Sequence, residues 1–373
     1  MNKRQIFAIS AGVLSLAMGI FAVRVYWFPS VSTTPKSPMP ETHELPGTNT
    51  RLSGPYTYKN LTVYLIHGDD VRKGATPLTL EEAMERKLVV VHETSDVNEL
   101  AIENVSPTVL VKGGGSTVGI GAYDVYVQAG DIVKGGKQDR VLAVDLIVPA
   151  RSGRMPIDSF CVEHGRWTPR GNESSTRFES SNEYVASKDM KIAAKHSKSQ
   201  GQVWNEVEKS QDKLSAATNS NTASSHSRSS LPLTIENPRV REDSAEYVKA
   251  LSDITHSKAD VIGFLFAING EINSADTYGS SGLFLKLWPK LLKAPAIEAV
   301  AESEQAETRP VENVPQASLA DIETFFETSE TAPIADERKV TDRIKMLTRE
   351  SRTSVFIESL DGGMLLHRNF IMK

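Results

Sequence analysis

The chain has 373 residues, of which 39% are hydrophobic, 24% charged and 7% aromatic, a composition typical of folded proteins rather than of disordered or collagen-like chains. Its formal net charge of −5 provides no global cationic field for a nucleic-acid backbone, so a nucleic-acid partner is not expected. The single cysteine, Cys161, excludes both an intramolecular disulfide and a thiolate-rich zinc site.

The N-terminal segment has the pattern of a membrane anchor. Lys3 and Arg4 precede an apolar run over residues 6–23, close to the shortest helix that spans a bilayer core, and aromatic residues follow at 26–28. A cleaved secretory signal is the alternative, but the residues after the run form a poor cleavage site. We predict an uncleaved transmembrane signal-anchor over 1–28, with the bulk of the chain extracytoplasmic, either periplasmic or at the cell surface.

A tether is predicted to follow the anchor, over residues 29–56. Six prolines lie in this segment, among Ser, Thr and Gly. Each proline lacks an amide donor and restricts the residue before it, so neither a helix nor a central strand is expected. The tether would hold the folded part away from the membrane.

Residues 57–300 are predicted to form an α+β domain with a mainly antiparallel sheet or sandwich and several helices. Short β-rich runs alternate with glycine and proline, and Thr79 can form a capping box with Glu82 at the start of a short helix. Asn269-Gly270 favours a tight hairpin. Residues 218–231 are almost entirely Ser, Asn, Thr and His, which predicts a flexible loop.

The last segment, 301–373, is predicted to hold an acidic linker, a short helix near 320–327 and a C-terminal β-hairpin. The hairpin signal is Asp361-Gly362-Gly363 between two apolar runs. We expect this hairpin to join the same sheet.

Two glycine-rich runs, 112–119 and 130–138, suggest a phosphate-binding loop at first sight. Such a loop has a glycine five residues before its Gly-Lys pair and a hydroxyl directly after it. In the second run these positions are Asp131 and Gln138, so both runs are interpreted as turns between strands. No cofactor is therefore predicted.

Two further segments are more distinctive, Lys134-Gly-Gly-Lys-Gln-Asp-Arg-Val-Leu142 and Phe160-Cys-Val-Glu-His-Gly-Arg-Trp167. With Leu80-Glu-Glu-Ala83, the stretch Gly270–Ser280 and Trp288, they resemble a family of prokaryotic proteins, the ADP-ribosylglycohydrolase and rhodanese-phosphatase superfamily associated protein domain. The resemblance covers about residues 60–300. The family has no settled activity, and its genomic association with ADP-ribose chemistry implies a nucleotide-derived ligand.

We predict that the two distinctive segments form one polar site at strand ends. The ligand-binding candidates are Lys137, Gln138, Arg140, Arg166 and Trp167. The acid–base candidates are Asp139, Glu163 and His164. In the alternative interpretation these residues pair internally, because buried charges require partners, and the site is a structural network.

Two other groupings are weaker candidates. Cys161 with His164 or His92 would suggest a nucleophile and base, but a lone cysteine is usually a small buried hydrophobe, and no metal site is predicted around it. Glu271 and Asp276 could be a carboxylate pair or solvated hairpin residues.

The sequence leaves three functions open, and it does not decide whether the protein is an enzyme. The leading one is a membrane-tethered extracytoplasmic binding or accessory domain whose partner is a small anionic ligand. The second is a hydrolase of a small phosphorylated or nucleotide-derived ligand, and the third is a structural envelope component. No protein partner is identified.

Overall fold

The computed structural model describes residues 42–45, 49–107, 109–113, 116–120, 123–184, 187–303 and 315–373. The predicted anchor over 1–28 and most of the predicted tether lie outside these residues. None of the helices in the described part of the chain combines the length and apolar character that crossing a bilayer requires.

The largest sheet has nine strands, all antiparallel to their neighbours, in the order β1-β2-β3-β15-β16-β20-β19-β18-β17. Their bounds are β1 Thr42–Glu44, β2 Arg51–Tyr58, β3 Leu61–His67, β15 Val261–Ile268, β16 Glu271–Tyr278, β17 Ile334–Lys339, β18 Ile344–Glu350, β19 Ser354–Asp361 and β20 Met364–Met372. The predicted hairpin turns are confirmed: Asn269 and Gly270 have φ of 54° and 88°, and Gly362 and Gly363 have φ of 59° and 86°.

A second sheet has six strands in the order β14-β10-β11-β13-β6-β5. Their bounds are β5 Val89–Asp96, β6 Glu99–Asn104, β10 Asp131–Gly135, β11 Arg140–Leu142, β13 Arg154–Cys161 and β14 Phe178–Tyr184. Two small sheets complete the strands, one of β4 Leu78–Thr79, β9 Val125–Val127 and β12 Leu146–Val148, and one of β7 Val109–Gly113 and β8 Ser116–Ile120. Only the β4–β9 pair is parallel among the described strands, so the predicted α+β class with antiparallel sheets is confirmed.

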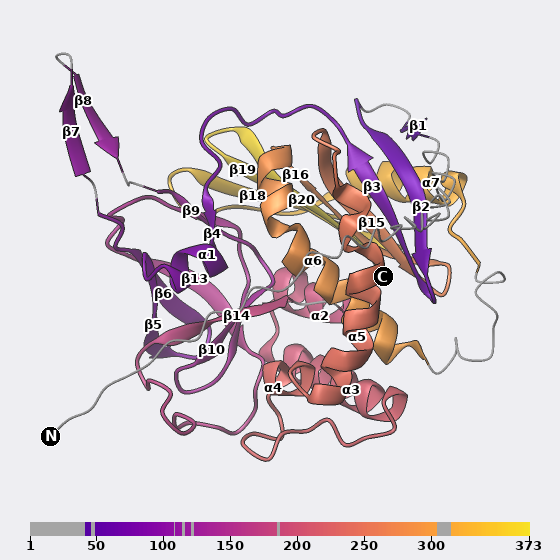
Figure 1. The fold of residues 1–373 in the computed structure, drawn as a ribbon, viewed down its shortest axis with the longest axis horizontal. Helices are drawn as coiled ribbons and strands as arrows, with labels where there is room; N and C mark the ends of the chain where they lie inside the picture. Colours follow the sequence, from indigo (N-terminus) through magenta and orange to yellow (C-terminus); the bar gives the residue numbers. More distant parts are fainter. Residues whose placement is uncertain are drawn as a thin grey trace, which may run out of the picture. The chain divides into compact units, whose positions relative to one another are not determined.

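The described helices are short to medium in length. They are α1 Leu80–Glu85, α2 Lys188–Lys191, the π-helix η1 Ile192–Ser197, α3 Gln200–Ala217, α4 Leu231–Ile235, α5 Pro238–Leu251, the 3₁₀-helix η2 Ser252–Thr255, α6 Ser281–Ala301 and α7 Leu319–Glu330. The capping box predicted at Thr79 and Glu82 is present at the start of α1. In Figure 1, α3, α4 and α5 gather beside α6, while α7 lies along the C-terminal strands.

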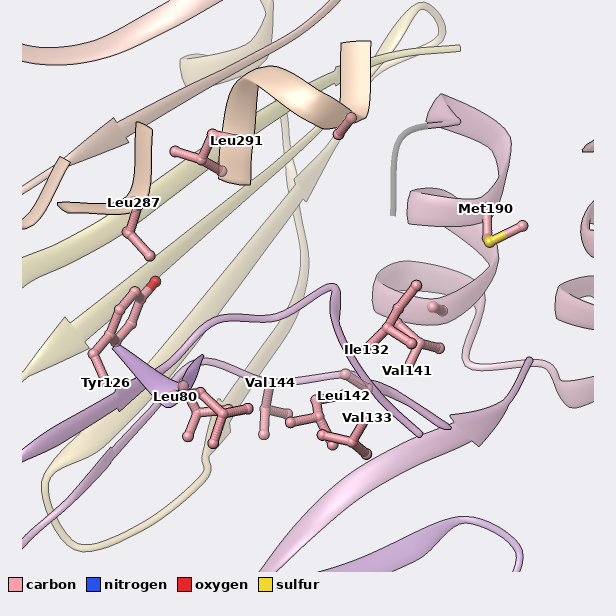
Figure 2. Packing of buried hydrophobic residues seen from close by; sticks show 14 of the residues in the cluster. Leu80, Tyr126, Ile132, Val133, Val141, Leu142, Val144, Met190, Leu287 and Leu291 are labelled. Atoms are coloured by element: carbon pink, nitrogen blue, oxygen red, sulfur yellow. The ribbon is translucent and has the colours of Figure 1, made fainter. Parts of the chain in front are cut away.

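The nine-stranded sheet carries a different apolar core on each face. On β3, Leu61, Val63 and Leu65 belong to the larger core, whereas Tyr64 and Ile66 belong to a smaller one beneath α7. This alternation follows from the two-residue side-chain period of a strand. The larger core fills the space between this sheet, α6 and the second sheet, and Figure 2 shows Leu287 and Leu291 of α6 facing it.

Three expectations differ from the structure. Strand β2 begins inside the predicted tether, and Pro55 is tolerated because it lies at a register shift between Ser53 and Tyr56, where a missing amide breaks no regular ladder bond. The predicted C-terminal segment supplies two strands, β17 and β18, besides the expected hairpin. Residues 219–230 form a loop as predicted, but Thr222 and Ser230 within it are fully buried.

Candidate functional site

The two distinctive segments lie side by side in the second sheet. Strand β11 pairs with β13 so that Arg140 stands opposite Cys161. The turn before β11 therefore lies beside the chain that leaves β13, and it brings Asp139 close to Glu163: the backbone amide of Asp139 donates to the Glu163 carboxylate at 3.0 Å. Backbone pairing alone thus explains why these residues meet.

Asp139, Glu163, Arg166 and Arg170 form a buried set that we call the first charge network. Arg170 Nη2 lies 2.6 Å from Asp139 Oδ1, and Arg166 Nε lies 2.7 Å from Glu163 Oε1. Ser230 donates to Asp139 Oδ2 at 2.7 Å. Both carboxylates are inaccessible to solvent and both guanidiniums are below 10% exposed. Glu173, which is partly exposed, also lies 3.0 Å from Arg170 and 3.8 Å from Arg166, so three carboxylates share the two guanidiniums, as the structural-network interpretation requires.

The protonation of this network follows from burial and pairing. Burial, helped by the neighbouring Glu163, raises the pKa of Asp139 despite its bonds from Arg170. Burial would also raise the pKa of Glu163, but the hydrogen bond from Arg166 and further bonds lower it. Neither carboxylate lines any of the cavities described below. An acid or base in this position has no substrate within reach, so the geometry does not favour a catalytic role.

Arg140, the first residue of β11, is also enclosed by the protein. Its guanidinium is 1% exposed, lies 3.7 Å from Glu93 and 3.3 Å from Gln138 Oε1, and contacts the Cys161 sulfur. Burial raises the pKa of the Cys161 thiol to about 11, so the thiol is neutral at physiological pH. The geometry therefore supports neither Arg140 as an open anion-binding group nor Cys161 as a nucleophile.

The other predicted site residues lie at the surface and do not converge. Lys137 Nζ donates to Ser95 at 3.0 Å, and the exposed ring of His164 meets the edge of Trp204 at 4.5 Å between centroids. Trp167 is 57% exposed, while the guanidinium of the adjacent Arg166 is buried in the first charge network. The predicted ligand set is thus divided between a buried network and separate surface positions.

Asp276 and Glu271 lie at different depths on β16 and do not form a pair. Glu271 is exposed at the start of the strand, whereas Asp276 is fully buried. Asp276 instead accepts from the His367 ring, with Oδ1 3.0 Å from Nε2, and Asp145 Oδ2 lies 3.1 Å from the other ring nitrogen. Burial would lower the pKa of His367, but the two carboxylates raise it to about 9, so the ring is an imidazolium at neutral pH.

Asp145, Asp276 and His367 form, with two buried lysines, a set that we call the second charge network. The sequence-based prediction missed both lysines. Lys191 Nζ donates to Ser274 at 2.8 Å, and Lys195 Nζ donates to Asn369 at 3.0 Å. Burial lowers the pKa of both, that of Lys195 to about 8. Their spacing beside Ala193 and Ala194 gave no signal of burial, because lysines are normally exposed and Lys195 lies in the π-helix η1 that follows α2.

A groove of about 880 Å³ runs between α5 and α6. Arg241 and Lys249 of α5 and Lys293 of α6 line it, and none of the three forms an ion pair among the described residues. The groove's carboxylates are engaged elsewhere: Glu236 with Lys134 at 2.5 Å and Glu242 with Arg239 at 3.2 Å. We call this surface the cationic groove, and no motif in the sequence pointed to it.

A second open cleft, of about 800 Å³, lies by α7 on the other face of the nine-stranded sheet. Phe326, Phe356 and Phe370 contribute to its apolar lining. Its Arg368 is held by Glu358 at 2.7 Å and by Glu330 at 3.5 Å. Arg349 also lines the cleft and donates to the Ala332 carbonyl at 2.7 Å, so the cleft holds one paired arginine and one bound to a backbone oxygen.

The fold and the two charge networks together define the class of this protein. It is a mixed α+β domain with antiparallel sheets, and its distinctive polar motifs are largely buried. A family model, the ARG and Rhodanese-Phosphatase-superfamily-associated Protein domain, matches residues 49–371, and the chain belongs to this family. The match extends beyond the resemblance over 60–300 and includes β2 and the C-terminal strands of the nine-stranded sheet. Among curated proteins and solved structures, none matches the chain.

Proposed function

We propose that this protein is a binding or accessory domain for a small phosphorylated ligand, held outside the cytoplasm by an N-terminal membrane anchor. The cationic groove supports the ligand, because three cations that form no ion pair with the described residues line one concave surface. The apolar run with basic flanks over residues 6–23 supports the anchor.

The placement of the groove's cations favours an extended anion. Arg241, Ala245 and Lys249 follow one another at four-residue intervals on α5, so they share a face with a small residue between the two cations. Eight residues of helix separate the cations by about 12 Å along the axis. A ligand with more than one anionic group suits this arrangement, because the long side chains of Arg241 and Lys249 can approach it from both ends.

Arg241 has no evident role in stabilising the helix. It lies in the first turn of α5, which contains no acidic residue, and a cation there is opposed by the helix dipole. Arg239 in the same turn is compensated by Glu242 and Asp243, but Arg241 has no ion pair among the described residues. An uncompensated cation at this position is better explained by a ligand than by folding.

A structural envelope component is the second candidate, and one observation favours it. The polar motifs on which the family resemblance rests form internal pairs, as expected of residues that maintain a fold. The hydrolase alternative is less favoured, because two of its three acid–base candidates, Asp139 and Glu163, are inaccessible to solvent and only His164 is exposed.

Isothermal titration calorimetry on the full chain in detergent tests the proposal, with pyrophosphate, ADP and ADP-ribose as ligands. We expect binding that weakens with salt and is lost in the triple variant Arg241→Ala/Lys249→Ala/Lys293→Ala. The control variant, Lys73→Ala/Lys345→Ala/Arg352→Ala, removes the same charge from exposed positions outside the groove and should bind normally. Equal binding by both variants would refute the groove, and no binding by the wild type would favour the structural alternative.

A further inference from the structure

A narrow cavity of about 60 Å³ lies between α2, α3 and α6. Apolar side chains form much of its lining, including Met190, Leu214 and Ile297. Glu298 of α6 also lines it. We call this cavity the Glu298 slot.

The carboxyl group of Glu298 is only half satisfied. Oε1 accepts from the Asn273 side chain at 3.0 Å, whereas Oε2 is buried and has no hydrogen-bond partner within the described part of the chain. A buried acceptor without a partner loses its bonds to water and gains nothing in return. Burial accordingly raises the pKa of Glu298 to about 7.

The charges around the slot favour a cation. Four carboxylates and two ammonium groups line it, and both ammonium groups are already engaged. Lys213 lies 2.5 Å from Glu302, and Lys209 lies 2.7 Å from Glu206. Glu298 itself forms no ion pair among the described residues. Burial raises its pKa most, the nearby ammonium groups of Lys191 and Lys213 lower it, and Glu302 raises it.

We propose that the Glu298 slot binds a primary alkylammonium group. The ammonium would donate to Oε2 of Glu298, and the alkyl stem would pack against Met190, Leu214 and Ile297. A compact –NH₃⁺ on an unbranched stem suits a small, largely apolar cavity, whereas a quaternary ammonium has no proton to donate to Oε2. Such binding requires nothing of the cationic groove.

Calorimetric titration of the full chain with n-butylammonium chloride at pH 8 tests this site. We expect saturable binding that Glu298→Gln weakens at least tenfold, and no binding of tetramethylammonium. Glu327→Gln makes the same change at an exposed position of α7 and should leave binding intact. Unchanged binding by Glu298→Gln, or equal binding of both ammonium ions, would overturn the proposal.

The wild type provides a second test if Glu298→Gln does not fold. With a pKa of about 7, roughly a tenth of the Glu298 carboxyl is ionised at pH 6 and nine-tenths at pH 8, so affinity should fall about tenfold at the lower pH. At pH 7, binding should release about half a proton, measured by titration in buffers of different ionisation enthalpy. Affinity independent of pH, with no proton released, would refute the role of Glu298.

Discussion

The first charge network makes a quantitative prediction about stability. Replacing Arg166 with Met removes the partner 2.7 Å from Glu163 and leaves that buried carboxylate beside Asp139, with Arg170 Nη1 at 3.6 Å as its remaining cation. Breaking a buried pair from one side costs about 3–5 kcal/mol, which at roughly 2 °C per kcal/mol is a fall in Tm of about 6–10 °C. Thermal and urea unfolding of the purified chain would measure the change.

A double-mutant cycle separates this explanation from a general loss of packing. Glu163→Gln together with Arg166→Met removes both charges, so the double variant should be more stable than the sum of the single effects predicts, by about 1 kcal/mol or more. The exposed pair Arg239–Glu242, at 3.2 Å, is the matched control, and Arg239→Met should cost less than about 1 kcal/mol. If Arg166→Met lowers the free energy of unfolding no more than Arg239→Met does, the first charge network does not stabilise the fold.

Three further outcomes are expected. Two carboxylates outweigh the effect of burial and raise the pKa of His367 from its ordinary 6.5 to about 9. The stability that the charged ring contributes is therefore complete below pH 6.5 and is lost as the pH rises through 9. The free energy of unfolding in urea should fall less across this range for His367→Gln than for the wild type. Gly263→Ala would place a Cβ 2.2 Å from the carbonyl oxygen of Asp276 and should lower Tm strongly. Gly201→Ala lies in open space within α3 and should leave Tm unchanged or raise it, so equal Tm values for the two variants would contradict the close approach of β15 and β16. Full-length protein should fractionate with membranes and a chain lacking residues 1–28 should be released, while recovery of the full-length chain in the soluble cell interior would refute the anchor.

Local signals accounted for the parts of the fold that the sequence predicted correctly. The Thr79–Glu82 capping box and the two glycine hairpins depend on neighbouring residues only, so they are visible without knowledge of the tertiary structure. Strand β17 was missed for the opposite reason. It is an edge strand with the sequence Ile-Ala-Asp-Glu-Arg-Lys, and charged edge strands resemble linkers in composition.

The candidate site was harder to predict because its character depends on distant partners. Lysines are normally exposed, so the sequence pattern gives no reason to place Lys195 in a core, and its partner Asn369 lies on the last strand. Similarly, Asp139 and Glu163 were identified as neighbours, but Arg170, which buries and neutralises Asp139, was not singled out. Sequence patterns can predict that charged residues lie close together. Whether those residues face a ligand or one another depends on the tertiary packing.

The residues that make the chain recognisable and the residues that could bind a ligand are different sets. The distinctive segments supply Asp139, Glu163 and Arg166 to the first charge network, and the stretch 270–280 supplies Asp276 to the second. The cationic groove and the Glu298 slot are instead lined mostly by side chains of α2 to α6, outside those segments. The family model spans the sheets and these helices alike, and both proposed ligand sites lie on the helices. On this view, Arg166→Met should destabilise the protein without changing the ligands it selects, whereas the triple groove variant should change ligand binding without altering Tm.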